Sequence, residues 1–130
     1  MKTIFDASND RDTLRVVADQ RGSPTSALDL ADGLLRLLDR WGGQCGTYHL
    51  AARSEASWYD LACEVMNVRK RLGLRVAEIE PIATQDWPTK ARRPANSVLD
   101  SGKAERDFGI RLPDWRQSVA EVVVRLAASL

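Results

Sequence analysis

One stretch of seven residues, Asp-Gln-Arg-Gly-Ser-Pro-Thr at 19–25, constrains the fold of this chain more than any other. It joins a β-type run at 14–18 to an amphipathic segment at 26–41. Gly22 tolerates positive φ and Pro24 fixes its own φ, so the stretch suits a turn from a strand into a helix. Polar side chains at the end of a strand also suit a loop that binds a ligand. The residues alone leave both interpretations open.

The segment from residue 26 to residue 41 has the apolar spacing of a helix. Leu34, Leu38 and Trp41 recur at intervals of three or four residues, and further leucines widen the same face. Asp29 lies three residues after Ser26, as in a capping box with Asp in the acidic position. We expect this leucine face to be part of the hydrophobic core.

The rest of the chain alternates short strand patterns with helical ones. Ser57 and Asp60 form a second capping-box pattern, and Pro81 favours an edge position for its strand. These features predict a single domain, 1–130, of the α/β class and α+β-like, with short strands in a small partial sheet under about four to five helices. Strands are predicted at 14–18, 47–51 and 76–82, and helices at 1–9, 57–71, 101–109 and from 113 onward.

Composition and charge exclude several classes of function. The 130 residues are 44% apolar and 28% charged, as in ordinary globular proteins, and the net charge of +1 provides no attraction for nucleic acid. No apolar run is long enough for a signal peptide or a membrane span. Cys45, Cys63 and the single histidine, His49, cannot form a zinc site at familiar spacings. We therefore expect a cytoplasmic protein with free thiols that binds neither nucleic acid nor membrane.

Several short motifs follow one another in a fixed order along the chain. They are the stretch at 19–25, Gly-Thr-Tyr-His-Leu-Ala at 46–51, Ala-Ser-Trp-Tyr at 56–59, Pro-Thr at 88–89, Arg-Pro-Ala-Asn-Ser-Val-Leu-Asp at 93–100 and Phe-Gly-Ile-Arg-Leu-Pro-Asp-Trp at 108–115. In this order the motifs resemble the dTDP-4-dehydrorhamnose reductases of the extended short-chain dehydrogenase/reductase superfamily. The resemblance covers nearly the whole chain, but only the C-terminal, substrate-binding portion of the family.

The resemblance implies that cofactor and substrate bind to two different parts of the family's enzymes. The N-terminal Rossmann domain holds the nicotinamide cofactor and a Tyr-x-x-x-Lys pair, and the C-terminal part closes over the nucleotide-sugar. Here Tyr48 and Tyr59 are followed at the fourth position by Ala52 and Cys63, so neither has the lysine. The glycines at 42–46 follow a helix, whereas a dinucleotide loop opens one. We expect this chain to bind no cofactor and to be inactive alone; the complete enzyme would use NADPH or NADH, and the magnesium described for the family has no ligand set here.

The same resemblance assigns candidate contacts to a dTDP-sugar. Arg93 is the first choice, because a guanidinium can bind two oxygens of a diphosphate. The residues leave open that Arg93 instead pairs with Asp19 or Asp100 and only shapes its loop. Trp58 could stack on a sugar or base, although the start of an amphipathic helix also suits a core position. The other candidates are Asn96 and Ser97 beside Arg93, and Gln20, Ser23 and Thr25 in the first stretch.

Two hypotheses of different classes result. The first is the nucleotide-sugar binding domain of an NADPH-dependent reductase that passes hydride to C4 of dTDP-4-dehydro-L-rhamnose in dTDP-L-rhamnose biosynthesis, as the resemblance implies. The second is a non-catalytic interaction or regulatory module of the same fold. In either case we expect the face that packs on the Rossmann domain in the family to meet that domain, another partner or a second copy in a homodimer.

Overall fold

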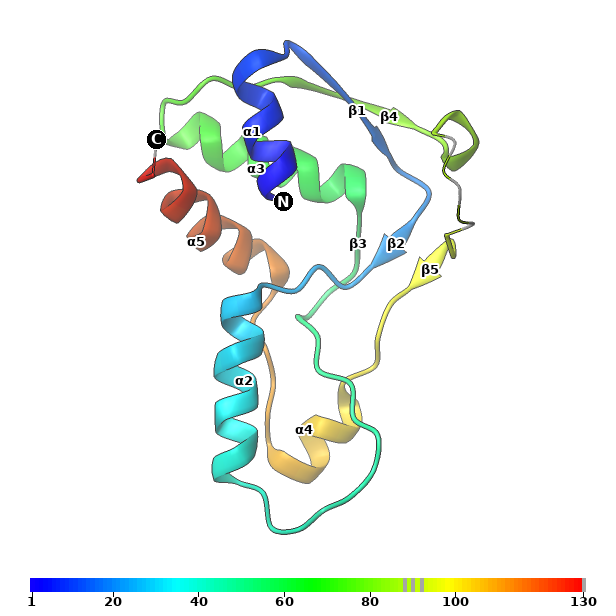
Figure 1. Cartoon of the computed structure of the whole chain (residues 1–130), viewed down its shortest axis with the longest axis vertical. Helices are drawn as coiled ribbons and strands as arrows, with labels where there is room; N and C mark the ends of the chain where they lie inside the picture. The colour runs from blue at the N-terminus through cyan, green and yellow to red at the C-terminus, as the bar shows by residue number, and fades with distance from the viewer. Residues whose placement is uncertain (88, 90, 92, 130) are drawn as a thin grey trace.

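In the computed structural model, two long helices, α3 (Trp58–Arg71) and α5 (Trp115–Ala127), pack against each other and form the centre of the hydrophobic core. A third helix, α1 (Lys2–Asp10), packs on α3 and buries Phe5 (Figure 1). No helix in the described part of the chain is long and apolar enough to cross a membrane. The structure describes residues 1–87, 89, 91 and 93–129. The largest buried apolar side chains are those of Trp115, Phe5, Ile110, Leu112, Val65, Val119 and Val123.

The strands form two small sheets beside this core. In the first sheet, β1 (Thr13–Val17) and β4 (Glu78–Ile82) run parallel. In the second sheet, β2 (Arg21–Gly22) is central, antiparallel to β3 (Ala56–Ser57) and parallel to β5 (Asn96–Ser97). The predicted α/β class and the helices are confirmed, but the strands divide between two sheets instead of forming one.

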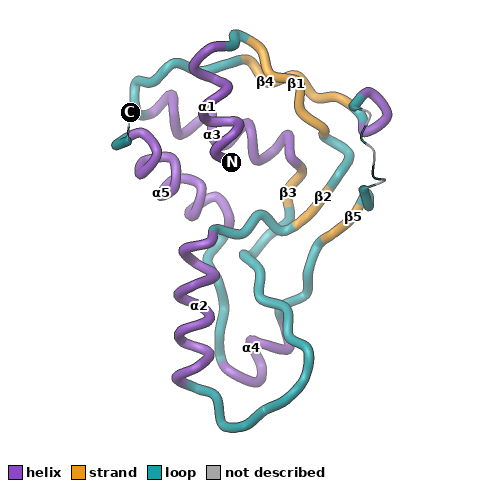
Figure 2. Tube along the Cα trace, in the orientation of Figure 1, coloured by secondary structure: helices purple, strands orange, loops and turns teal. Residues whose placement is uncertain are grey.

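Helices α2 (Ala27–Asp39) and α4 (Gly102–Phe108) lie away from the core, in the lower half of Figure 1. A long loop leads from α2 back to β3, and residues 47–51 are part of it (Figure 2). The prediction of a strand at 47–51 is therefore wrong. The alternation of its side chains suits a strand, but in the described part of the chain no other strand pairs with it, and a strand forms only with a partner for its backbone groups.

The leucine face of α2 is exposed, so the prediction that it joins the core is also wrong. Leu35 and Leu38 are 63% and 64% exposed, whereas Gly33 is buried. A Cβ atom on Gly33 would lie 2.7 Å from Cδ2 of Leu112. The helix thus approaches the rest of the chain on the side that carries no side chain at this position. Helical spacing identified the apolar face correctly, but it does not say what covers that face.

Side-chain caps fix the N-terminal ends of α2, α3 and α5 (Trp115–Ala127). At α3, Ser57 Oγ accepts from the Asp60 N–H at 3.0 Å and the Asp60 carboxylate accepts from the Ser57 N–H at 2.8 Å, so the predicted capping box is confirmed. At α2, Ser26 Oγ accepts from the Leu28 N–H, and Asp29 does not complete the predicted box.

Arg69 is a buried polar centre that connects three segments. Arg69 is 1% exposed, and its guanidinium carbon lies 4.3 Å from the centre of the Phe5 ring. The guanidinium donates to the Phe5 carbonyl at 3.1 Å, to Asn9 Oδ1 at 2.7 Å and to the Arg75 carbonyl at 2.8 Å. These bonds hold α1 and the segment after α3 against the end of α3.

Replacing Arg69 by Ala should therefore destabilise the whole domain. The change leaves buried acceptors without a donor, and we expect the free energy of unfolding to fall by about 3 kcal/mol. Urea denaturation followed by circular dichroism measures this. The matched control is Arg71→Ala, whose exposed guanidinium lies 3.5 Å from Glu64 and whose loss should cost less than about 1 kcal/mol. Equal losses in the two variants would contradict this role of Arg69.

The capping box also predicts a pH dependence of stability. Hydrogen bonds from the Ser57 N–H and then the Ser57 hydroxyl lower the pKa of Asp60, with partial burial opposing them. A carboxyl whose pKa is lowered by folding stabilises the native state above its unfolded pKa, and this contribution is lost as pH falls through the folded value. Asp60→Asn should cost about 1 kcal/mol at pH 7, and the difference from the unchanged chain should shrink below about pH 4. Unfolding curves at several pH values test this; a difference independent of pH would contradict it.

Candidate functional site

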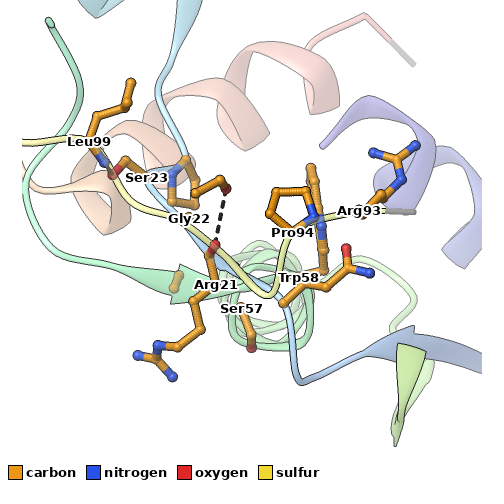
Figure 3. A pocket seen from close by; sticks show the side chains of 12 residues that line it. Arg21, Gly22, Ser23, Ser57, Trp58, Arg93, Pro94 and Leu99 are labelled. Atoms are coloured by element: carbon orange, nitrogen blue, oxygen red, sulfur yellow. Dashed lines mark hydrogen bonds between the residues drawn. The ribbon is translucent and has the colours of Figure 1, made fainter. Parts of the chain in front are cut away.

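The hollow beside β2 collects most of the predicted site residues. Its volume is about 380 Å³, and three segments that are distant in the sequence form its walls (Figure 3). The segments meet because β2 pairs with β3 on one side and with β5 on the other. We call this cavity the β2 hollow. Its walls consist of Gln20, Arg21, Gly22, Ser23, Pro24, Ala56, Ser57, Trp58, Arg93, Pro94, Ser97 and Leu99.

The pairing of β2 with β5 requires a close approach at Gly22. A Cβ atom there would lie 2.9 Å from Ser97 Oγ, which itself donates to the Arg21 carbonyl at 3.1 Å (Figure 3). Ser23 Oγ accepts from the Leu99 N–H at 3.3 Å. Gly22 is thus needed for close contact between two backbones, and the two serines hold the later loop against the first stretch.

A second set of bonds holds residue 84 at the end of β1. Thr84 is the first residue of the 3₁₀ turn Thr84–Asp86, and it donates to Asp19 through its N–H at 2.9 Å and its hydroxyl at 2.6 Å. The Gln20 amide donates to Thr84 Oγ1 at 3.1 Å. The hydroxyl bond first, and then the backbone bond, lower the pKa of Asp19. Gln20 therefore reaches the hollow with its amide already oriented by Thr84.

Arg93 borders the β2 hollow with an exposed side chain. Within the described residues, no carboxylate lies within 4.0 Å of its guanidinium. Asp19 is bound by Thr84, and Asp100 accepts from the Gly102 N–H at 2.7 Å. The alternative in which Arg93 pairs with Asp19 or Asp100 is therefore wrong. In Figure 3 the guanidinium points away from Ser23.

Trp58 lies between the β2 hollow and a second cavity. The indole is 47% exposed, so the prediction that it could be a core residue is wrong. The second cavity has a volume of about 590 Å³ and lies between α1, β1 and Trp87. We call it the Trp87 hollow. Three residues line both hollows: Gln20, Trp58 and Arg93. Arg93 and Gln20, which are distant in the sequence, thus border the same two hollows.

Two of the predicted site residues lie outside both hollows. Thr25 Oγ1 donates to the Ser23 carbonyl and accepts from the Ala52 N–H, so it fixes the loop before α2. Asn96 Oδ1 accepts from the Val98 N–H within its own turn. The sequence analysis did not predict some residues that line the hollow. Ser57 is one of them, because it was interpreted only as the cap of a helix. The weaker candidates, Lys90 and Arg92, are outside the described residues.

The described residues do not fit a nicotinamide cofactor or a metal ion. The glycines at 42–46 lie in the loop after α2 and open no helix, so they do not form a phosphate-binding turn. In the described ranges, no three His, Cys, Asp or Glu side chains come together as a metal site. Cys45 and Cys63 are free thiols. The chemistry that these residues support is recognition of a polar ligand by hydroxyl, amide, guanidinium and indole groups.

Comparison with known proteins agrees with the family that the motifs indicate. A family model described as the RmlD substrate binding domain matches residues 1–128. A dTDP-4-dehydrorhamnose reductase from Sinorhizobium fredii is 38% identical over 128 residues, which are 95% of this chain and 43% of that protein. A reductase of the same name from Escherichia coli K12 is 35% identical and is covered to 44% of its length.

Two solved structures share the architecture of this chain. A dTDP-4-dehydrorhamnose reductase from Clostridium acetobutylicum matches 97% of this chain with a TM-score of 0.85 and 33% identity, although only 43% of that chain is covered. A Bacillus anthracis reductase solved with NADP shares the fold, with a TM-score of 0.82 and 24% identity. The fold is thus that of one portion of such a reductase. The chain belongs to the RmlD substrate binding domain family, and it spans less than half the length of the curated relatives that it matches.

The contact between Thr84 and Asp19 gives a local test of this geometry. Thr84→Val removes the hydroxyl that contributes most to the low pKa of Asp19, so this pKa should rise toward its ordinary value. An NMR titration of the Asp19 carboxyl measures it. Thr89→Val is the control, because the Thr89 hydroxyl donates to the Ala91 carbonyl in its own loop. An unchanged Asp19 pKa in Thr84→Val would contradict the described arrangement.

Proposed function

We propose that the β2 hollow and the Trp87 hollow together bind a nucleotide-sugar, with Arg93 at the diphosphate. The observation that carries this proposal is that Arg93, Gln20 and Trp58 line both hollows. A nucleotide-sugar has its charged diphosphate in the middle and an uncharged group at each end. Arg93 has no carboxylate partner among the described residues and lies at the junction of two cavities, which suits such a ligand because a guanidinium can bind two phosphate oxygens.

The ends of the ligand find different surroundings on the two sides of Arg93. The β2 hollow offers the hydroxyls of Ser23 and Ser97, which suit a sugar or ribose. The Trp87 hollow is walled mainly by apolar side chains together with two exposed indoles, which suit stacking on a base. We assign dTDP-4-dehydro-L-rhamnose as the ligand because the relatives are named dTDP-4-dehydrorhamnose reductases.

In the complete reductase, this domain would hold the substrate for reduction by a cofactor bound elsewhere. The described residues do not fit a nicotinamide group, and a reductase that shares the fold was solved with NADP. We infer that NADPH binds to the part of the protein outside this match, and that the isolated chain does not reduce the sugar. With free thiols and no described helix that spans a membrane, the domain would work in the cytoplasm.

A second function, that of an interaction module, is favoured by a separate observation. The exposed leucines of α2 form an apolar surface that the site described above does not use. The two functions are compatible, because a domain that binds a substrate must also meet the part of the protein that performs the reaction.

Ligand titration of the isolated chain tests the proposal. We expect dTDP-rhamnose and dTDP to bind with a Kd on the order of 1 mM, because the open hollows leave one side of the ligand in water. NMR shifts should concentrate at residues 20–24 and 93–97. Arg93→Gln should weaken binding about tenfold, and dTMP, which lacks the second phosphate, should bind less well than dTDP.

The matched control is Arg111→Gln. Arg111 is an exposed arginine that lies 3.6 Å from Glu105 and lines neither hollow. Equal weakening in the two variants would indicate a general effect of charge and would contradict the assignment of Arg93. Shifts outside both hollows would contradict the site itself.

A further inference from the structure

A third hollow adjoins the β2 hollow, and the proposed function does not use it. Its volume is about 450 Å³, which is within the range of small-molecule sites. Its walls are the loop before β3, the connection from β5 to α4 and the residues after α4 (Figure 1). Ser23 and Leu99 line both hollows, so the two adjoin at these residues. We call this cavity the Arg53 hollow. Its charged residues are Arg53, Glu55, Asp100, Glu105 and Arg111.

The charges of the Arg53 hollow have both signs but are not closely paired with one another. Within the described residues, neither Arg53 nor Asp100 has an oppositely charged group within 4.0 Å. The pair of Arg111 and Glu105 is exposed, and its atoms are 3.6 Å apart. Three carboxylates disfavour an anionic ligand, and two guanidinium groups disfavour a cationic one. The hollow therefore suits a neutral ligand that both donates and accepts hydrogen bonds.

Two serine hydroxyls of the hollow add further donors. Ser23 Oγ accepts from the Leu99 N–H at 3.3 Å, and Ser101 Oγ accepts from the Ala51 N–H at 3.0 Å. A hydroxyl that accepts a hydrogen bond still has its own proton to donate. Together with the carboxylates as acceptors and the guanidinium groups as donors, these serines match the hydroxyls of a sugar, each of which donates one proton and accepts through its oxygen.

Apolar side chains provide the rest of the surface. Val98 and Leu99 line the hollow and are 39% and 46% exposed, while Ile110 and Leu112 are buried in the same wall. The face of a sugar ring carries C–H groups, and these gain free energy when they cover exposed apolar carbon. An apolar wall bordered by charges of both signs is thus suited to both the face and the edge of such a ring.

The backbone at residue 53 is fixed before any ligand binds. The Arg53 N–H donates to the Pro113 carbonyl at 2.9 Å, and the Arg53 carbonyl accepts from the Trp115 N–H at 3.3 Å. Ser54 has a φ of 65°, in the left-handed region that non-glycine residues rarely adopt. Its hydroxyl donates to Asp114 Oδ2 at 2.6 Å. A ligand that binds Arg53 would therefore have to order the side chain but not the loop, which lowers the cost of binding.

We propose that the Arg53 hollow binds a neutral saccharide of one or two rings, at a site separate from that of the nucleotide-sugar. In this site Arg53 donates to sugar oxygens, Asp100 accepts from sugar hydroxyls, and Leu99 contacts a ring face. The proposal rests on the charges, hydroxyls and apolar wall of this hollow. It does not depend on which ligand occupies the β2 hollow.

A titration of the whole chain with uncharged sugars tests this site. The probes are methyl α-L-rhamnopyranoside, with one ring, and maltose, with two, followed by the NMR shifts of backbone amides. We expect a Kd on the order of 10 mM for the tighter probe, with shifts at residues 51–55, 100–102 and 110–112. Shifts at Ser23 and Leu99 do not discriminate, because both residues also line the β2 hollow. Inorganic phosphate and spermidine, as anionic and cationic probes, should shift these residues less.

Two variants assign the binding to its charged groups. Arg53→Gln and Asp100→Asn should each weaken sugar binding about fivefold, because each replaces a charged hydrogen-bond partner by a neutral one. Arg125→Gln is the matched control. Arg125 is an exposed arginine on α5 that lies 2.7 Å from Glu121 and lines none of the three hollows. The melting temperature of each variant shows whether it is folded.

Four results would overturn the proposal. They are the absence of shifts at 51–55, 100–102 and 110–112 with both sugars, larger shifts there with phosphate or spermidine, sugar shifts confined to residues 21–22 and 93–94 of the β2 hollow, and an equal loss of binding in Arg125→Gln. No probe or readout of this experiment involves dTDP, so this proposal and the nucleotide-sugar proposal fail or stand separately.

Discussion

The pairing of β2 on both of its sides is the constraint on which the site depends. β2 is only two residues long, yet it brings β3 and β5 to the same place from positions far along the chain. The Arg21 N–H donates to the Ala95 carbonyl at 2.8 Å, and Gly22 allows β5 to come close. So short a ladder is weak by itself. Its geometry is maintained by the side-chain bonds around it and by the helical core behind it.

Sequence patterns predicted local structure well and long-range contacts poorly. The capping box of Ser57 and Asp60 was found because both partners lie within one helical turn. The prediction of a strand at 47–51 was wrong for the opposite reason. The alternating pattern is present, but a strand also requires a neighbouring strand, and the residues of one segment do not reveal which segment lies beside it. The prediction that the leucine face of α2 joins the core was wrong for a similar reason. Periodicity identifies the apolar side of a helix, but it does not show whether another part of the chain covers that side.

The candidate site was predicted in outline by the order of its motifs. Gln20, Ser23, Trp58, Arg93 and Ser97 lie around the β2 hollow, although no single motif implied that they meet. Thr25 and Asn96 were placed there because their polar groups resemble those of their neighbours. In the structure the same groups bind backbone atoms of their own loops, and composition cannot separate a loop-forming hydroxyl or amide from one that faces a ligand.

The β2 hollow and helix α2 are connected by a very short segment. Ser23 and Pro24 line the hollow, and Ser26 already caps the helix. Thr25, between them, donates to the Ser23 carbonyl and accepts from the Ala52 N–H. Because a single residue separates the lining residue Pro24 from the cap Ser26, the position of α2 and the position of this edge of the hollow depend on each other.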